Sequence, residues 1–118
     1  ENIKLNNIKN VYTGRLSGKE TLEAFKGVRI FRRLKDIDLE QFEIDSIFLD
    51  PPREGLDSFT LENIIGIKNI IYISCGFDSF KRDIQALKAT HDILKLAMFD
   101  QFPYTEHIES GAILRKKY

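Results

Sequence analysis

Two short runs of consecutive apolar residues, each followed by polar and turn-forming residues, stand out along the chain. The first is residues 47–49, inside the stretch 45–50, and the second lies in residues 70–74. A continuous apolar run of this length is typical of a strand that is covered on both faces. Pro51 and Pro52 cannot donate to a ladder, so they end the first strand. The pattern therefore predicts two buried strands of one sheet.

Helical patterns follow each of these two strands. Asp57 is placed to cap a short helix that Gly66 ends. After the second strand comes the clearest amphipathic helix of the chain. Its apolar positions, which we expect to be core residues only, are Phe77, Phe80, Ile84 and Leu87. A strand-helix alternation is therefore predicted for the middle of the chain.

The region before the first apolar run carries weaker signals. A Ser-Gly-Lys-Glu run at residues 17–20 is a capping box, which predicts the start of a helix. Gly27 interrupts this helix, and residues 28–34 are expected to form a second helical piece. Residues 8–13, which precede the capping box, are expected to form a short strand.

Two more strands are predicted near the C-terminus, at residues 93–99 and 111–114, and the pattern also allows the second to start near Glu106. The predicted strands and helices follow the order β-α-β-α-β-α-β-β along the chain. This order predicts an α/β fold with a mostly parallel sheet and right-handed crossovers. A short loop at residues 100–105 joins the last two strands, so these two are expected to pair as an antiparallel hairpin. The chain, residues 1–118, is interpreted as a single partial domain.

Composition narrows the picture mainly by exclusion. The chain has 118 residues, 42% hydrophobic and 31% charged, which suits one domain with a real core. No apolar run reaches the length of a membrane span. The single cysteine excludes an internal disulfide and fits a reducing, cytoplasmic setting, and two histidines far from it argue against a zinc site. The formal net charge of zero gives no argument for nucleic-acid binding.

Reactive side chains follow both buried strands. Asp50 and Arg53 come after the first strand, beside the rigid Pro-Pro pair, and Cys75 comes directly after the second. In an open α/β sheet, binding sites form outside the carboxyl ends of the strands. Two such loops predict one site of an enzyme rather than a generic domain.

The motifs in these loops, taken in order, give the chain a family resemblance. Residues 11–118 resemble the C-terminal part of the tRNA (uracil-5-)-methyltransferases, the enzymes that make ribothymidine in the T-loop. The matching segments contain the motifs Asp-Pro-Pro-Arg, Ile-Ser-Cys, Asp-Gln-Phe-Pro-Tyr-Thr and His-Ile-Glu, at residues 50–53, 73–75, 100–105 and 107–109. The resemblance implies the C-terminal portion of a Rossmann-like class I methyltransferase domain, with an antiparallel last strand. It also implies S-adenosylmethionine as cofactor, the T-arm of tRNA as partner, and no metal.

The resemblance implies roles for three residues. Cys75 would be the nucleophile, because a thiolate that adds to C6 of uracil makes C5 able to accept a methyl group. Glu109 would be the base that removes the C5 proton afterwards. Asp50 would contact the cofactor or hold the loop. Taken alone, the same residues would be read as a buried inert thiol, a surface carboxylate and a turn-forming aspartate.

Other residues near these motifs have two interpretations each. Arg53 would orient the uracil, the cysteine loop or a phosphate, or else form a surface ion pair. Gln101 and Phe102 lie in the loop between the last two strands, where Phe102 would either stack on an extruded base or pack in the core. His91 and His107 are interpreted as structural.

The chain departs from the family pattern in two respects. The family usually has Asn-Pro after the cysteine, whereas this chain has Gly76 and Phe77, so the rigidity of proline is lost. The glycine-rich cofactor loop of the family is absent from these residues. The 118 residues alone are therefore expected neither to bind the cofactor tightly nor to methylate RNA. They are also expected to self-associate through strand edges left open by absent neighbours.

Three other functions stay open. A 23S rRNA uracil-5 methyltransferase shares the Asp-Pro-Pro-Arg and Ser-Cys elements, and only residues 99–105 argue against it. An amino-methyltransferase would have an aromatic residue in place of Arg53 and would not need Cys75. A non-catalytic α/β interaction module that lacks the cofactor half is the remaining alternative.

Overall fold

The computed structural model describes all of residues 1–118, which divide into two compact units. Unit 1 is Glu1–Phe42 and unit 2 is Glu43–Tyr118. None of the helices is both long and apolar enough to cross a bilayer. The single partial domain expected from the sequence stays a prediction.

Unit 1 contains short helices only. They are α1 (Asn2–Leu5), α2 (Gly18–Phe25) and the single 3₁₀ turns η1 (Arg32–Leu34) and η2 (Leu39–Gln41). The predicted capping box of α2 is confirmed. The Ser17 hydroxyl accepts from the Glu20 amide at 3.2 Å, and the Glu20 carboxylate accepts from the Ser17 amide at 2.9 Å. Two of the four free amides of the helix start are thereby satisfied.

Two expectations for unit 1 are wrong. Residues 8–13 form no strand, and only the last three of residues 28–34 are helical. A strand needs a partner for its backbone amides and carbonyls, and the sheet of this structure has none for residues 8–13. Residues 28–34 do not form a full helix because they include β-branched residues and lack a continuous apolar stripe. Packing therefore contributes too little free energy to offset the cost of helix nucleation.

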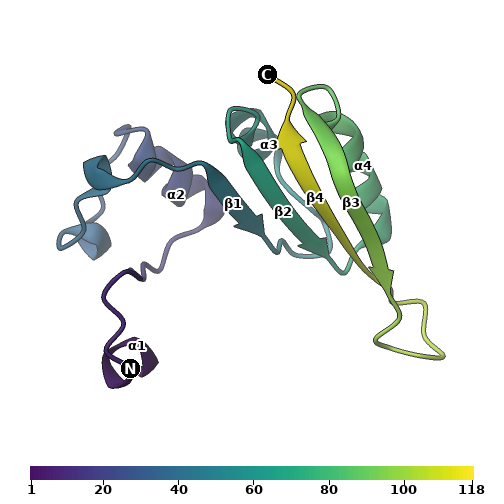
Figure 1. Ribbon diagram of the computed structural model, residues 1–118, viewed down its shortest axis with the longest axis horizontal. Helices are drawn as coiled ribbons and strands as arrows, with labels where there is room; N and C mark the ends of the chain where they lie inside the picture. The colour runs from purple at the N-terminus through teal and green to yellow at the C-terminus, as the bar shows by residue number, and fades with distance from the viewer. The chain divides into compact units, whose positions relative to one another are not determined.

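Unit 2 is a four-stranded sheet with two helices (Figure 1). Its elements are β1 (Ser46–Leu49), α3 (Ser58–Ile64), β2 (Asn69–Ser74), α4 (Phe77–Leu87), β3 (His91–Phe99) and β4 (Glu109–Lys116). The strand order is β1-β2-β4-β3. β1 pairs parallel with β2, while β4 pairs antiparallel with both β2 and β3. Three strands therefore run in one direction and the last runs against them, as the sequence predicts.

The core of unit 2 lies between the sheet and its helices, which Figure 1 shows on one face only. On β2, Ile70 and Tyr72 are fully buried, and on β4 Leu114 is fully buried. The helices contribute Ile64, Phe80, Ile84 and Leu87. His91, interpreted as structural, is buried with Nε2 2.7 Å from the Ile67 carbonyl oxygen.

Two burial expectations are wrong. Phe48, in the first apolar run, is 61% exposed, because it points to the sheet face that the helices of unit 2 do not cover. Its neighbours across the ladder on that face, Ile71 and Ile113, are also exposed. Phe77 was expected in the core but is 48% exposed, since it is the first residue of α4 and precedes the first turn that packs on the sheet.

Candidate functional site

The topology of the sheet brings the candidate residues to one edge. Asp50 follows the carboxyl end of β1, and Cys75 follows the carboxyl end of the parallel strand β2. Because β4 is antiparallel, it begins at the same edge, and its first residue is Glu109. The loop from β3 to β4, which contains Gln101 and Phe102, also lies there.

Cys75 and Glu109 occupy facing positions across β2 and β4. The ladder ends with Ser74 opposite Ser110, so the next residue on each strand is Cys75 and Glu109 respectively. Both side chains are partly buried, and Cys75 forms no disulfide. A thiol and a carboxylate at the same end of the sheet are the kinds of group that a nucleophilic addition and a proton removal require.

The loop after β1 presents Arg53 to the β3–β4 connection. Nη2 of Arg53 lies 3.3 Å from Nδ1 and 3.4 Å from Nε2 of His107. Sequence reasoning interpreted His107 as structural and did not pair it with Arg53. The signal available was its place two residues before Glu109 in the His-Ile-Glu motif. The contact links the Asp-Pro-Pro-Arg loop to the start of β4, while Asp50 itself stays exposed.

The β3–β4 connection is largely exposed. The Phe102 carbonyl accepts from the Thr105 amide at 3.2 Å and from the Thr105 hydroxyl at 2.7 Å, which closes a turn. Phe102 is about half exposed, and Gln101 is exposed. Phe102 is therefore not a fully buried core residue.

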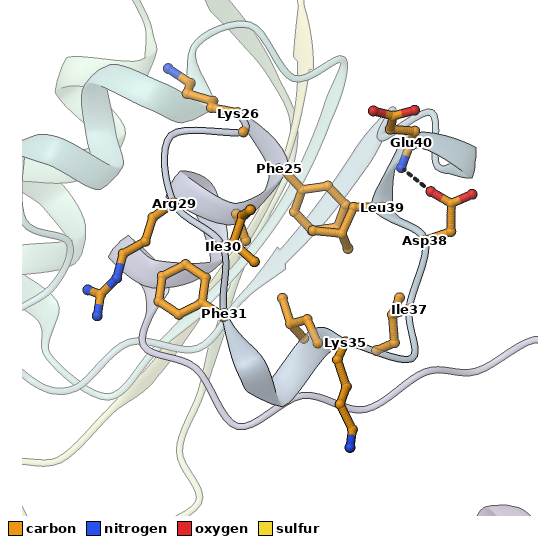
Figure 2. A pocket seen from close by; sticks show the side chains of 13 residues that line it. Phe25, Lys26, Arg29, Ile30, Phe31, Lys35, Ile37, Asp38, Leu39 and Glu40 are labelled. Atoms are coloured by element: carbon orange, nitrogen blue, oxygen red, sulfur yellow. Dashed lines mark hydrogen bonds between the residues drawn. The ribbon is translucent and has the colours of Figure 1, made fainter.

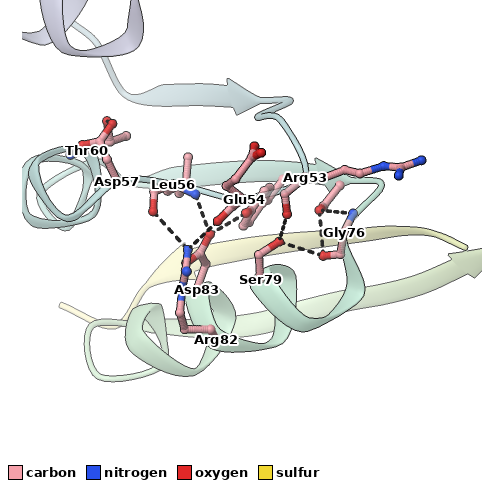
Figure 3. A network of polar contacts seen from close by, with 11 residues as sticks. Arg53, Glu54, Leu56, Asp57, Thr60, Gly76, Ser79, Arg82 and Asp83 are labelled. Atoms are coloured by element: carbon pink, nitrogen blue, oxygen red, sulfur yellow. Dashed lines mark hydrogen bonds and ion pairs between the residues drawn. The ribbon is translucent and has the colours of Figure 1, made fainter. Parts of the chain in front are cut away.

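A buried carboxylate holds the Arg53 loop against α4 (Figure 3). Oδ2 of Asp83 accepts from the Leu56 amide at 2.8 Å and from the Tyr72 hydroxyl at 2.6 Å. Oδ1 accepts from Nε of Arg82 at 2.9 Å, and Nη2 of Arg82 also donates to the carbonyls of Glu54 and Leu56. Burial raises the pKa of Tyr72, and the hydrogen bond to Asp83 raises it further, so this phenol stays a donor.

Sequence reasoning missed this network, although one signal was present. Asp83 stands three residues after Phe80 and directly before Ile84, which places it in the apolar stripe of α4. A carboxylate in such a stripe is buried and must find donors. The donors come from β2 and from the loop after β1, and no local pattern identifies them.

A second set of hydrogen bonds surrounds Cys75. The Ser74 hydroxyl accepts from the Gly76 amide at 3.0 Å and lies 3.1 Å from the Gly76 carbonyl oxygen. These contacts connect the two residues on either side of Cys75. The Ser79 hydroxyl lies 2.6 Å from the carbonyl oxygen of Arg53 and 3.0 Å from that of Gly76. The cysteine loop and the Arg53 loop are therefore joined through one side chain of α4.

Unit 1 has a cavity of its own, with a volume of about 530 Å³ (Figure 2). Apolar side chains such as Phe25, Phe31 and Leu39 line it together with charges of both signs. The Asp38 carboxylate there accepts from the Glu40 amide at 3.1 Å, which is the cap of η2. No residue that the sequence analysis singled out as a candidate site residue lines this cavity.

The sheet order, with its last strand reversed between two parallel ones, and the residues gathered at its carboxyl edge define a class I methyltransferase fold. A solved structure from Pyrococcus abyssi, a tRNA (uracil-54, C5)-methyltransferase in complex with S-adenosyl-L-homocysteine, has this fold. It superimposes with a TM-score of 0.65 and 26% sequence identity over 96% of this chain and 24% of that one.

The family follows from comparison of the sequence. The family model for tRNA (Uracil-5-)-methyltransferase matches residues 1–117. A tRNA/tmRNA (uracil-C(5))-methyltransferase of Sulfurovum sp. is 49% identical over 117 residues, 99% of this chain and 32% of that protein. The corresponding protein of Shewanella amazonensis is 44% identical over 116 residues. The chain belongs to the tRNA (uracil-5-)-methyltransferase family and spans about a third of the length of these relatives.

Proposed function

We propose that this chain forms the nucleophile-bearing part of an S-adenosylmethionine-dependent enzyme that methylates C5 of the T-loop uridine in tRNA. The observation that carries the proposal is the facing placement of Cys75 and Glu109 at the carboxyl edge of the sheet. Family membership supports the reaction class, and the names of the relatives support tRNA as the substrate class. The remaining two thirds of such an enzyme would supply the rest of the cofactor site.

The two residues would divide the chemistry between them. The Cys75 thiolate adds to C6 of the uracil, forming an S–C6 bond, and the C5–C6 electron pair moves to C5 and O4. C5 then takes the methyl group, which the cofactor supplies when bound. Glu109 removes the proton from C5, the C5–C6 double bond forms again, and the S–C6 bond breaks. The thiolate is recovered, and Glu109 returns to its carboxylate form when it releases the proton to water.

The residues present fit one side of the cofactor only. Asp50 is exposed beyond the end of β1 and offers a carboxylate, which is a suitable acceptor for an ammonium or hydroxyl group. No glycine-rich loop accompanies it in the sequence. We therefore expect the 118 residues alone to bind S-adenosylmethionine weakly, and calorimetry that finds micromolar affinity would contradict this.

The exposed groups at the edge suit an extruded base. A uridine in a folded T-arm must leave its stack before a thiol can reach C6. Phe102 is about half exposed and offers an aromatic ring for stacking, and Arg53 and Gln101 are exposed donors near the same loop. The proposed partner is thus the T-arm of tRNA, in the reducing cytoplasm where a free thiol persists.

Self-association of the isolated residues is a separate proposal. β1 stands at the end of the strand order, and its outer edge has no partner in the sheet. Unpaired edges recruit other chains. Light scattering of the 118-residue chain should show concentration-dependent dimers, and a monomer at all concentrations would rule this out.

A trapping experiment tests the function. The full-length protein that carries these residues is incubated with S-adenosylmethionine and a T-arm RNA that contains 5-fluorouridine at the target. Fluorine cannot leave as a proton, so a denaturant-stable protein–RNA adduct is expected, and Cys75→Ala should abolish it. A 23S rRNA hairpin treated in parallel tests the alternative substrate. Absence of any adduct with both RNAs would favour a non-catalytic interaction module.

A further inference from the structure

We propose that Ser79 is a positioning residue that fixes Cys75 for attack by tying the cysteine loop to the Arg53 loop, with the Arg82–Asp83 pair as its anchor. The inference rests on the proposed function in one respect, since the purpose it assigns is placement of the Cys75 sulfur. None of these three α4 residues is expected to touch the uracil.

The anchor is the most buried part of the arrangement. The Asp83 side chain is fully buried, and its two oxygens receive hydrogen bonds from β2, from the loop and from Arg82. A buried carboxylate with this many donors has one favourable position, because any shift leaves a charge unpaired in the core. The middle of α4 is therefore fixed relative to β2 and to the loop at Leu56.

The Arg53 loop lies directly against α4 between Ser79 and Asp83. Gly55 has a φ of +79°, and a Cβ added there would be 2.5 Å from Oδ2 of Asp83 and 2.9 Å from Cβ of Ser79. Only glycine combines this conformation with so close an approach. The loop thus has no freedom to move toward the helix, and its contacts with Asp83 and Arg82 prevent it from moving away.

Ser79 extends the same anchoring to the cysteine. Its hydroxyl lies 2.6 Å from the Arg53 carbonyl oxygen and 3.0 Å from that of Gly76, one residue after Cys75. Ser74 bridges Gly76 from the other side of the cysteine. Cys75 is thereby held between two hydroxyl contacts, which restricts its backbone without the proline that the family usually has two positions later.

Gly76 belongs to this arrangement for a steric reason. A Cβ at Gly76 would collide with the Arg53 carbonyl oxygen and would come within 2.8 Å of Oγ of Ser79. The two loops therefore approach each other at the residue that follows the nucleophile. The glycine that stands here in place of the family's usual asparagine thus allows the two loops to come into close contact.

The test uses Cys75 as its own reporter, because it is the only cysteine of the chain. Its alkylation by iodoacetamide is measured by mass spectrometry of the peptide that contains Cys75, in the full-length protein and in its Ser79→Ala, Ser79→Thr and Ser58→Ala variants. Cys75 should be alkylated about fivefold faster in the Ser79→Ala variant, because the loss of one hydrogen bond makes opening of the loop more frequent. Ser79→Thr keeps the hydroxyl and should restore the original rate. The control is Ser58→Ala, the same change at the exposed first position of α3, and Cys75 should be alkylated at the original rate in it too.

Hydrogen exchange separates positioning from general destabilisation. In Ser79→Ala, amides of residues 53–56 and 75–76 should exchange faster while those of β4 keep their rates. In the full-length enzyme, kcat should fall about tenfold, with KM for the RNA within about twofold. Unchanged alkylation, or faster exchange throughout β4, would overturn the proposal. Because alkylation and exchange need no turnover, they decide the role of Ser79 even if the methylation proposed above is wrong.

Discussion

Unit 1 and unit 2 bury their apolar residues in different ways. Unit 1 has a small core of Ala24, Phe31 and Leu34, packed by partly buried Leu16, Ile37 and Leu39. Its other large apolar side chains stay outside this core, and Ile30 is 97% exposed. Its hydrogen bonds are mostly those of single helical turns and caps.

Unit 2 is fixed by pairings between residues that are distant in sequence. Three ladders define its sheet, and the Asp83 network joins α4 to β2 and to the loop after β1. All the candidate site residues lie in this unit. The loops proposed to act on RNA thus stand on the unit whose backbone is paired between distant segments, as chemistry that needs defined geometry requires.

The largest expected difference between the units concerns buried charge. Asp83→Ala removes the acceptor for the Tyr72 hydroxyl and the Leu56 amide, and it should lower the stability of unit 2 by about 3–5 kcal/mol. Asp38→Ala, the same change at the exposed cap of η2, should cost unit 1 about 1 kcal/mol. Native-state hydrogen exchange, read separately for residues 1–42 and 43–118, measures both. Equal losses would remove the distinction between the units.

Glycine substitutions give the next largest effect. Gly76→Ala should destabilise unit 2 by about 1–3 kcal/mol, because the new Cβ collides with the Arg53 carbonyl. Gly27→Ala in unit 1 meets no atom within 4 Å, so its cost of about 1 kcal/mol comes only from the φ of +69°. Cys75 alkylation distinguishes the two causes. It should change in Gly76→Ala and stay constant in Gly27→Ala, and a change in both would argue against a local steric effect.

Two facing serines in unit 2 should behave in opposite ways. Ser110 is fully buried, and its hydroxyl has no hydrogen-bond partner, so Ser110→Ala should raise the free energy of unfolding by about 1 kcal/mol. Ser74 faces it across the ladder and holds Gly76, so Ser74→Ala should lower that free energy by a similar amount. Urea titrations of both variants check the signs. A loss of stability in Ser110→Ala would mean that its hydroxyl finds a partner in solution.

The smallest effect is a pH dependence in unit 1. The Ser17 amide lowers the pKa of Glu20 below its ordinary 4.5, and Arg33 lowers it further. A lowered pKa means that the folded state favours the ionised form. The contribution is therefore complete above pH 4.5 and is lost as the pH falls below it. NMR titration of Glu20 should show a midpoint below 4.5 that rises in Arg33→Gln but does not reach the ordinary value. A midpoint at or above 4.5 in the original chain would contradict this.

The order of amino acids alone predicts the local elements of unit 2 and the end of the sheet at which the candidate site lies. The apolar runs, the Asp57 cap and the stripe of α4 predict β1, β2, α3 and α4 because each depends on neighbouring residues. The rule that sites form at the carboxyl ends of strands then places Asp50 and Cys75 together. The role of Glu109 could be predicted only from the family resemblance, because no local sequence pattern distinguishes a functional carboxylate at the start of a strand.

The residues that hold the site in place are identified only by contacts between segments that are distant in the sequence. The partners of Asp83 come from three separate segments, and Ser79 meets the Arg53 carbonyl across 26 positions of the sequence. The same reason explains the errors at residues 8–13, Phe48 and Phe77. Whether a strand forms or an apolar side chain is buried depends on what another part of the fold places beside it, and hydrophobic pattern carries no information about that partner.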